Sequence, residues 1–193
     1  MPLILARELG SPEIQAIRKE VLAQATGTVL EIGSGLGYNF PFYPHIDKLY
    51  AVEPIEALIT RSKEKMSTVP FAVEFLNTGA ENIPLPDHCI DTVVSTWTLC
   101  SVANLSQTLS EIKRILKPTG VFIFVDHGAS PRYFVRFIQT IWTLLMRHFT
   151  GNCHHNRHIS DALTKAGFTI EHITCSAEPR SILIYNYEGI ARA

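Results

Sequence analysis

Three glycines alternate with other residues in the segment Glu31-Ile32-Gly33-Ser34-Gly35-Leu36-Gly37, which directly follows a short apolar run. Glycine adopts backbone angles that other residues avoid, and its missing side chain lets a ligand approach the backbone closely. The spacing is not the dinucleotide fingerprint G-x-G-x-x-G, because Tyr38 stands at the position of the third glycine. The acid two residues before the first glycine favours a ligand with an ammonium group, since a pyrophosphate prefers backbone donors without a nearby negative charge.

A second acid, Glu53, ends the next apolar run, 20 residues after Gly33. A carboxylate at this place accepts hydrogen bonds from both hydroxyls of a ribose, in nicotinamide and adenosyl ligands alike. The alternative for the glycine segment is a tight turn that binds nothing. The turn, the acid and their strand context occur together, and this combination favours a ligand site.

Histidines and cysteines farther along the chain form a second group with possible chemistry. His127 follows a buried apolar run, so it is a candidate catalytic base, with a solvated loop histidine as the alternative. Cys153, His154, His155 and His158 lie close together, and His154 and His158 have the spacing of one helix face. No C-x-x-C pair or matching carboxylate accompanies them, so we predict no metal site and leave the role of this segment open. Cys100 lies in an apolar run and is expected to be an inert thiol.

The elements that must position these residues alternate between apolar strands and amphipathic helices. Ser11-Pro12-Glu13 predicts a helix start, and Gly27 is expected to end that helix. The uninterrupted apolar run 121–125 is typical of a strand that helices cover on both faces. Alternation of this kind predicts a doubly wound α/β fold whose strand ends carry the site. Strands are expected at 28–32, 49–52, 71–76, 91–97, 121–125, 168–174 and 182–191, and later helices near 55–66, 104–116, 131–149 and 159–166.

Composition narrows the class of protein. The 193 residues fit one domain, and 46% hydrophobic against 18% charged residues predicts a full core. A net charge of −1 argues against sequence-independent nucleic-acid binding, which needs a basic face. Four cysteines without a C-x-x-C pair predict reduced thiols and a cytoplasmic location. We expect no secretory signal and no integral membrane segment, because no apolar run reaches about 18 residues.

Over residues 28–128 the chain resembles the class I S-adenosylmethionine-dependent methyltransferases. Four segments carry the resemblance: 29–37 with the glycine turn, 51–54 with Glu53, 79–85 with 90–94, and 116–120. It implies S-adenosylmethionine as cofactor and a Rossmann-like, seven-stranded, mostly parallel sheet with helices on both faces and an antiparallel last strand. The domain then runs over 1–193, with an N-terminal helical segment 1–27, a cofactor-binding half 28–128, and substrate-side helices and two strands in 129–193.

The resemblance also assigns roles along the cofactor. The methionine and ribose end is implied for Glu31 and the glycine turn, the ribose hydroxyls for Glu53, the adenine for Pro54 or Ile55, and its edge for Ala80 and Glu81. Many family members carry Asp at the position of Gly79 to accept from the adenine amine, and the side chain of Glu81 is the candidate substitute. The implied cofactor-binding residues are Glu31, Gly33, Ser34, Gly35, Gly37, Glu53, Pro54, Ala80, Glu81, Thr96 and Trp97.

A closer similarity is to the methyltransferase-like alkyl thiol methyltransferases, in segments 39–44, 98–102, 126–127 and 151–153. Those relatives begin with a membrane-anchoring segment, so we expect a soluble version here. The leading interpretation is methyl transfer to a small, apolar acceptor, with a thiol favoured. No Asn-Pro-Pro-Tyr motif follows the fourth strand, which removes the usual reason to propose a nitrogen acceptor. The aromatic residues expected to wall the acceptor pocket, or else to be plain core, are Trp97, Tyr133, Phe134, Phe137 and Trp142.

Two other functions remain open from the sequence. A nicotinamide-dependent dehydrogenase is opposed by Tyr38 and by the absence of a Tyr-x-x-x-Lys pair. A non-catalytic module that binds S-adenosylmethionine is an alternative because His127 is only a candidate and no catalytic dyad is evident. The acceptor, the oligomeric state and the pathway do not follow from the sequence.

Overall fold

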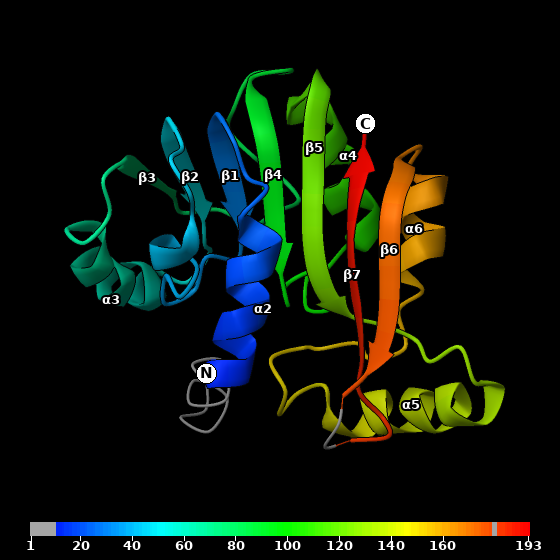
Figure 1. The fold of residues 1–193 in the computed structure, drawn as a ribbon. Helices are drawn as coiled ribbons and strands as arrows, with labels where there is room; N and C mark the ends of the chain where they lie inside the picture. Colours follow the sequence, from blue (N-terminus) through cyan, green and yellow to red (C-terminus); the bar gives the residue numbers. More distant parts are fainter. Residues whose placement is uncertain (1–10, 179–180) are drawn as a thin grey trace.

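A single seven-stranded sheet organises the protein, as seen in a computed structural model that describes residues 11–178 and 181–193. The strand order is β3-β2-β1-β4-β5-β7-β6, and neighbouring strands are parallel except that β7 is antiparallel to both β5 and β6 (Figure 1). The predicted sheet, with its reversed last strand, is therefore confirmed. The strands are β1 (Thr28–Ile32), β2 (Lys48–Val52), β3 (Ala72–Leu76), β4 (Ile90–Thr96), β5 (Leu116–His127), β6 (Thr169–Ala177) and β7 (Tyr185–Arg192).

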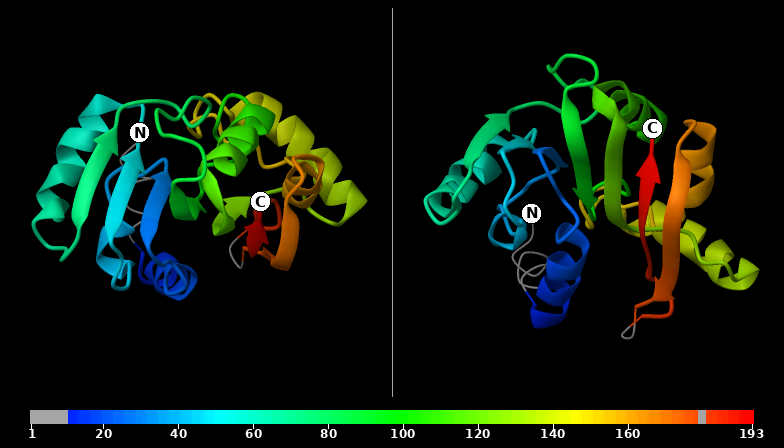
Figure 2. Two further views of the ribbon diagram at one scale, coloured as in Figure 1. Left: turned by 90° about the horizontal axis from the view of Figure 1, so that it is seen from above. Right: turned by 45° about the horizontal axis from the view of Figure 1, so that its top comes forward.

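Helices cover both faces of this sheet, and each face has its own apolar core. Helix α2 and the short 3-10 helix η1 pack on one face, around Leu22, Phe40 and Ile123. Helices α4 and α6 pack on the other face, around Ile112, Phe122 and Leu163 (Figure 2). The helices are α2 (Pro12–Leu22), η1 (Phe40–Phe42), α3 (Glu56–Met66), α4 (Leu105–Ile115), α5 (Tyr133–Met146) and α6 (Ile159–Lys165).

The first described helix begins as predicted and ends early. Ser11 caps α2 by accepting a hydrogen bond from the backbone N–H of Ile14, and Pro12 follows in the first turn. The helix ends at Leu22 rather than at Gly27. Gly27 instead serves the turn into β1: its φ is +66°, and a Cβ there would lie 2.7 Å from the Asp91 carboxylate.

The carboxyl ends of the parallel strands meet at one edge of the sheet, the lower edge in Figure 1. This edge receives the glycine turn after β1, Glu53 after β2, Trp97 after β4 and His127 at the end of β5. Helix α5 lies across the same edge below β5 and β6. The residues predicted from four separate parts of the sequence to do chemistry are thus gathered at one edge of the sheet.

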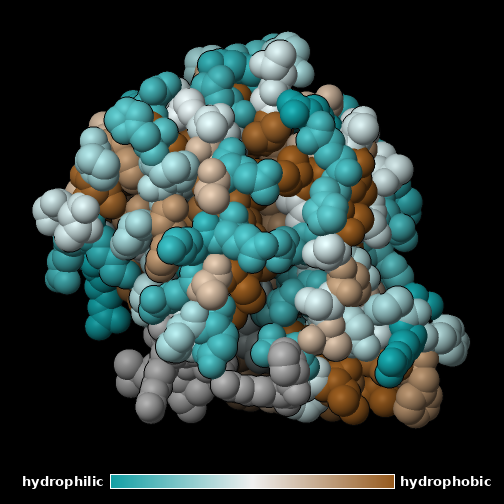
Figure 3. Space-filling model, in the orientation of Figure 1, coloured by the Kyte–Doolittle hydropathy of each residue, from teal (hydrophilic) through white to brown (hydrophobic). Residues whose placement is uncertain are grey.

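The aromatic residues of α5 are neither core nor the wall of an enclosed pocket. Tyr133, Phe134 and Phe137 are 78%, 72% and 58% exposed, and Trp142 is 40% exposed. Hydrophobic residues gather at the lower right of Figure 3, in the place that α5 occupies in Figure 1. The apolar periodicity of this segment correctly predicted a helix, but its apolar face is largely open to solvent. Across residues 11–178 and 181–193, no helix has both the length and the apolar character required to cross a bilayer.

Candidate functional site

The three glycines of the turn all have positive φ angles, but the space around them differs. A Cβ on Gly33 would lie 2.4 Å from the side chain of Thr98, and one on Gly37 would lie 2.8 Å from the ring of Phe40. The protein's own packing therefore excludes side chains at both places. At Gly35 the nearest atom to such a Cβ is a backbone oxygen 3.8 Å away. The turn thus leaves open space above Gly35, which is what a ligand that contacts the backbone needs.

Glu53 ties this turn to the end of β2. Its side chain is buried, with one carboxylate oxygen 3.0 Å from the backbone nitrogen of Gly35 and the other 2.9 Å from that of Ile55. Each carboxylate oxygen has two acceptor sites, so both oxygens keep capacity for a ribose hydroxyl. Pro54 and Ile55, predicted to pack on an adenine, follow directly and are exposed, Ile55 by 52%.

The first acid of the motif is enclosed by residues that the sequence analysis did not single out. The Glu31 carboxylate accepts hydrogen bonds from the Asn39 amide at 3.0 Å and from the Tyr43 hydroxyl at 2.8 Å. Burial raises the pKa of Glu31 to about 7, although hydrogen bonds from Tyr43 and Asn39 and the charge of Arg18 oppose the rise. Both oxygens already have protein partners, and a contact between Glu31 and a ligand's ammonium group stays a prediction.

Arg18 of α2 supplies the cation of this network. Its guanidinium donates to the Thr96 hydroxyl at 3.2 Å and to the Asn39 amide oxygen, and lies 4.9 Å from the ring centre of Trp97. Its Nε is buried with no hydrogen-bond partner among the residues that the structure describes. The burial of Arg18 could have been predicted from the sequence, because it lies four residues from both Ile14 and Leu22, on the apolar face of the helix.

Trp97 turns the chain sharply at the end of β4. Its φ is +51°, a left-handed conformation that is costly for a non-glycine residue and is concentrated at functional sites. The indole nitrogen donates to the Asn186 side chain of β7 at 3.2 Å. Thr96, just before it, is buried and accepts from Arg18 and Asn39. The structure thus brings Thr96 and Trp97 beside the Glu31 network, and their contact with the cofactor stays a prediction.

The predicted adenine-edge residues lie in the loop between β3 and β4. Ala80 is buried, and the Glu81 carboxylate accepts from the backbone nitrogen of Asn104 at 3.1 Å. A Cβ on Gly79 would lie 2.8 Å from the other Glu81 carboxylate oxygen. The Glu81 carboxylate therefore occupies the space beside position 79, as expected if it substitutes for the missing acid.

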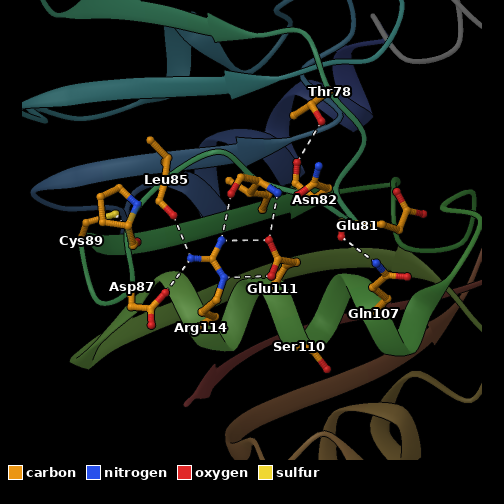
Figure 4. Close-up of polar contacts among 12 residues, drawn as sticks. Thr78, Glu81, Asn82, Leu85, Asp87, Cys89, Gln107, Ser110, Glu111 and Arg114 are labelled. Carbon is orange, nitrogen blue, oxygen red and sulfur yellow. Dashed lines mark hydrogen bonds and ion pairs between the residues drawn. The ribbon is translucent and has the colours of Figure 1, made fainter.

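Helix α4 fixes this loop in place. Arg114 donates to the backbone oxygens of Ile83 and Leu85 and pairs with Glu111, while Glu111 also accepts from the Ile83 nitrogen at 2.9 Å (Figure 4). Two charged residues of α4 thus hold the middle of the loop, at Ile83 and Leu85, against the helix. The position of Ala80 and Glu81 is therefore set by α4, far away in sequence.

A separate group of thiols and imidazoles lies at the ends of β4 and β5. The Nδ1 of His127 is 3.4 Å from the sulfur of Cys153 and 3.7 Å from that of Cys100. The Nε2 of His155 is 3.7 Å from the Cys153 sulfur, and its ring stacks on His127. Hydrogen bonds from Cys100, His127 and His155 lower the pKa of the Cys153 thiol, whereas the pKa of Cys100 is raised. We call Cys100, His127, Cys153 and His155 the thiol–imidazole cluster.

Asp126 holds the backbone of Cys100 and His127 in this cluster. Its buried carboxylate accepts four backbone N–H groups, those of Thr98, Leu99, Cys100 and His127, at 2.6 to 3.0 Å. The sequence analysis placed His127 at the strand end correctly but missed Asp126 as its support. The role of His127 as a base stays a prediction, and its Nδ1 faces two sulfurs.

Comparisons with known proteins agree with this geometry. A family model described as "Methyltransferase domain" matches residues 30–124. The thiol S-methyltransferase TMT1B of Rattus norvegicus is 31% identical over 150 residues, which cover 74% of this chain and 60% of the relative. The thiol S-methyltransferase TMT1A of Homo sapiens is 33% identical over 158 residues, 76% of this chain and 63% of the relative. The chain thus spans less than two thirds of the length of these two relatives.

Solved structures share the whole fold. A SAM-dependent methyltransferase from Aquifex aeolicus superposes with a TM-score of 0.67 at 19% identity, covering 99% of this chain and 98% of that one. A putative methyltransferase from Bacillus halodurans gives a TM-score of 0.72 at 16% identity, covering 93% and 96%. At these identities the likeness establishes the fold. Together with the matched domain and the related sequences it confirms the predicted family and its cofactor class: the chain belongs to the class I S-adenosylmethionine-dependent methyltransferases.

Proposed function

We propose that this chain transfers a methyl group from S-adenosylmethionine, bound across the glycine turn and Glu53, to a small thiol. The observation that carries the cofactor part is the open space above Gly35 next to the buried Glu53 carboxylate. A turn built only for packing would be closed at all three glycines, as it is at Gly33 and Gly37.

In this proposal, different residues bind different parts of the cofactor. Glu53 accepts from the ribose hydroxyls, Ile55 packs on the adenine, and the Glu81 carboxylate accepts from the adenine amine. The buried Ser34 hydroxyl in the turn has no hydrogen-bond partner among the described residues and offers a further polar contact. Arg18 is the candidate partner for the methionine carboxylate, since its Nε also lacks a partner in the described chain.

When bound, the cofactor supplies a methyl group on a sulfonium that is already a good leaving group. The protein then contributes mainly alignment and the exclusion of water. A small thiol fits such a site, because a pKa near about 8.5 leaves a few per cent as thiolate at neutral pH without a dedicated base. The names of the rat and human relatives support a thiol over other acceptors.

The acceptor side is proposed to lie between Trp97 and the start of α5. Trp97 donates to Asn186, whose amide donates to Glu178 at 3.3 Å. Glu178 lines a hollow of about 270 Å³ beside α5, together with Arg132, Val135, Ala177, Ser181, Ile182 and Tyr185. Apolar and polar groups are mixed here, which suits a small, mostly apolar acceptor with one polar atom.

A methyl-transfer screen tests the function. Methyl-labelled S-adenosylmethionine is incubated with the protein and with thiols, phenols, amines, lipids, a sugar, a peptide or an oligonucleotide. We expect label in small apolar thiols and none when a Gly35→Asn variant replaces the wild type. Labelling of a nucleic acid, sugar or peptide with inert thiols contradicts the thiol proposal. Cofactor binding without turnover on any class identifies a non-catalytic binding module.

A further inference from the structure

The thiol–imidazole cluster brings together three segments that are far apart in sequence. Cys100 follows β4, His127 ends β5, and Cys153 and His155 belong to the segment that leads into α6. The sulfurs of Cys100 and Cys153 and the ring nitrogen of His127 all lie within 4.8 Å of one another. Cys100, Cys153 and His155 are buried, at 1%, 6% and 6% exposure.

The spacings match the edges of a tetrahedral metal site. Zinc bonds of about 2.3 Å to sulfur and 2.0–2.1 Å to nitrogen place neighbouring sulfur and nitrogen ligands about 3.6 Å apart. The sulfur–nitrogen distances in the cluster are 3.4, 3.7 and 3.7 Å. Two thiolates with two imidazoles form a ligand set that selects zinc over the hard cations magnesium and calcium.

We propose that Cys100, His127 and Cys153 bind a zinc ion and that His155 closes its fourth position. Four protein ligands make this a closed, structural site. The Nε2 of His155 lies 3.7 Å from the Cys153 sulfur. Among the described residues of the cluster, only Cys100, His127 and Cys153 have ligand atoms that all lie within 4.8 Å of one another, so His155 closes the fourth position by a movement of its ring toward the other three.

The surroundings already hold the ligands in place. Asp126 accepts from the backbone nitrogens of Cys100 and His127, so one carboxylate positions two ligands. The segment that carries Cys153 and His155 is bonded to the segment that carries Cys100. The His154 nitrogen donates to the Cys100 oxygen at 2.8 Å, and Arg157 donates to the Val102 oxygen at 2.7 Å. Bound zinc would therefore fix the segment before α6 to the ends of β4 and β5, beside the proposed acceptor side.

This proposal departs from the sequence analysis, which considered His154 with His158 and predicted no metal site. His154 and His158 do not share a helix face, because α6 begins only at Ile159 and His158 caps it. The His158 side chain is half exposed and lies 3.7 Å from Asp161. It therefore provides a matched histidine control in the same segment. A zinc ligand also cannot serve as a free base, so the proposal competes with the base role of His127.

Metal analysis of the full chain, produced without a histidine tag and with zinc in the medium, tests the proposal. We expect about one zinc per chain after extensive desalting under reducing conditions. Cys153→Ser, Cys100→Ser, His127→Ala and His155→Ala should each lower zinc affinity, measured by chelator competition, by more than about 100-fold, beyond the usual effect of residues that only support a ligand. Cys175→Ser and His158→Ala should keep wild-type affinity, because Cys175 is exposed and lies on β6.

A second measurement on the wild type avoids variants that fail to fold. Alkylation followed by mass spectrometry should modify Cys100 and Cys153 faster after a chelator is added, with Cys89 and Cys175 unchanged. Cobalt substitution should give the visible absorption of a tetrahedral thiolate complex. Zinc-free wild-type protein after loading, alkylation that a chelator does not change, or a Cys100–Cys153 disulfide in protein isolated without reductant would each overturn the proposal. None of these readouts depends on methyl transfer.

Discussion

The two halves of the carboxyl edge are built in different ways. The proposed cofactor side, around β1 and β2, consists of short contiguous motifs: a glycine turn with one open position and an acid that bonds directly to it. The proposed acceptor side, around β4 and β5, draws its residues from four separate places in the sequence: Trp97 with Cys100, His127, Cys153 and Asn186. The first side can be predicted from the sequence because its motifs are local. The residues of the second side come together only in the folded protein.

The largest effect is expected from a substitution of Arg18, which contacts residues of both sides. Arg18→Met removes the donors to Asn39 and Thr96 and the positive charge that lowers the pKa of Glu31. The free energy of unfolding, from urea titration at pH 8, should fall by about 3–5 kcal/mol, because two hydrogen bonds from a charged donor are lost at about 1.5–3 kcal/mol each. Arg18→Lys should recover part of this loss. An unchanged unfolding midpoint for Arg18→Met would mean that the network does not stabilise the fold.

The second effect isolates the open position of the glycine turn. Asparagine tolerates positive φ better than other residues with a side chain, so Gly35→Asn should fold while its side chain fills the ligand's approach. Cofactor affinity, measured by calorimetry, should fall at least about 100-fold, or about 2.8 kcal/mol. Gly35→Val should lose binding too, with added backbone strain. Normal affinity in a folded Gly35→Asn variant would show that the cofactor does not contact this turn.

The third effect tests the buried acid through its pKa. A Glu31 pKa raised to about 7 means that the folded state holds this proton more tightly than the unfolded chain. The contribution of Glu31 to stability is therefore full below about pH 4.5 and is lost as the pH rises through about 7, by at most about 1.4 kcal/mol per pH unit. Glu31→Gln should remove this slope. Identical pH profiles of unfolding for both proteins would place the Glu31 pKa near its ordinary value.

The smallest effect concerns the exposed face of α5. Phe134→Ser should change the free energy of unfolding by no more than about 0.5 kcal/mol, because the side chain is 72% exposed. Cofactor affinity should also stay unchanged, while the KM for an apolar thiol rises if this face guides the acceptor. A loss of stability comparable to that of a core substitution would show that α5 packs against something that covers its aromatic residues.

Much of the fold could be predicted from patterns of apolar residues. Strand β1 and helix α3 lie within a residue of their predicted bounds, because buried strands and amphipathic helices have distinct periods. The β5 strand is longer than the predicted strand at 121–125, since its pairing with β4 begins at Leu116. Pairing between strands, and not local propensity, decided that boundary.

The candidate site could be predicted only where neighbours in sequence are neighbours in space. Glu53 was found because its spacing from Gly33 is fixed by one strand–helix–strand unit. Asn39 and Tyr43 were noted only as a family-like segment, and their hydrogen bonds to Glu31 depend on the η1 turn. No metal site was predicted for Cys153, His154, His155 and His158, because only the helical spacing of His154 and His158 was considered, and the chain forms turns there.

A calorimetric titration of S-adenosylmethionine into wild-type protein and into Glu53→Ala tests the central claim most directly. The account predicts one bound cofactor per wild-type chain, no binding of nicotinamide nucleotides, and an affinity for the variant weaker by about 1.5–3 kcal/mol, the range for hydrogen bonds to a charged group. The Glu53 carboxylate also bonds to Gly35 and Ile55, so circular dichroism should first show that the variant is folded. Equal affinity for wild type and a folded variant, or preferential binding of a nicotinamide nucleotide, would contradict the assignment of this edge of the sheet as an S-adenosylmethionine site.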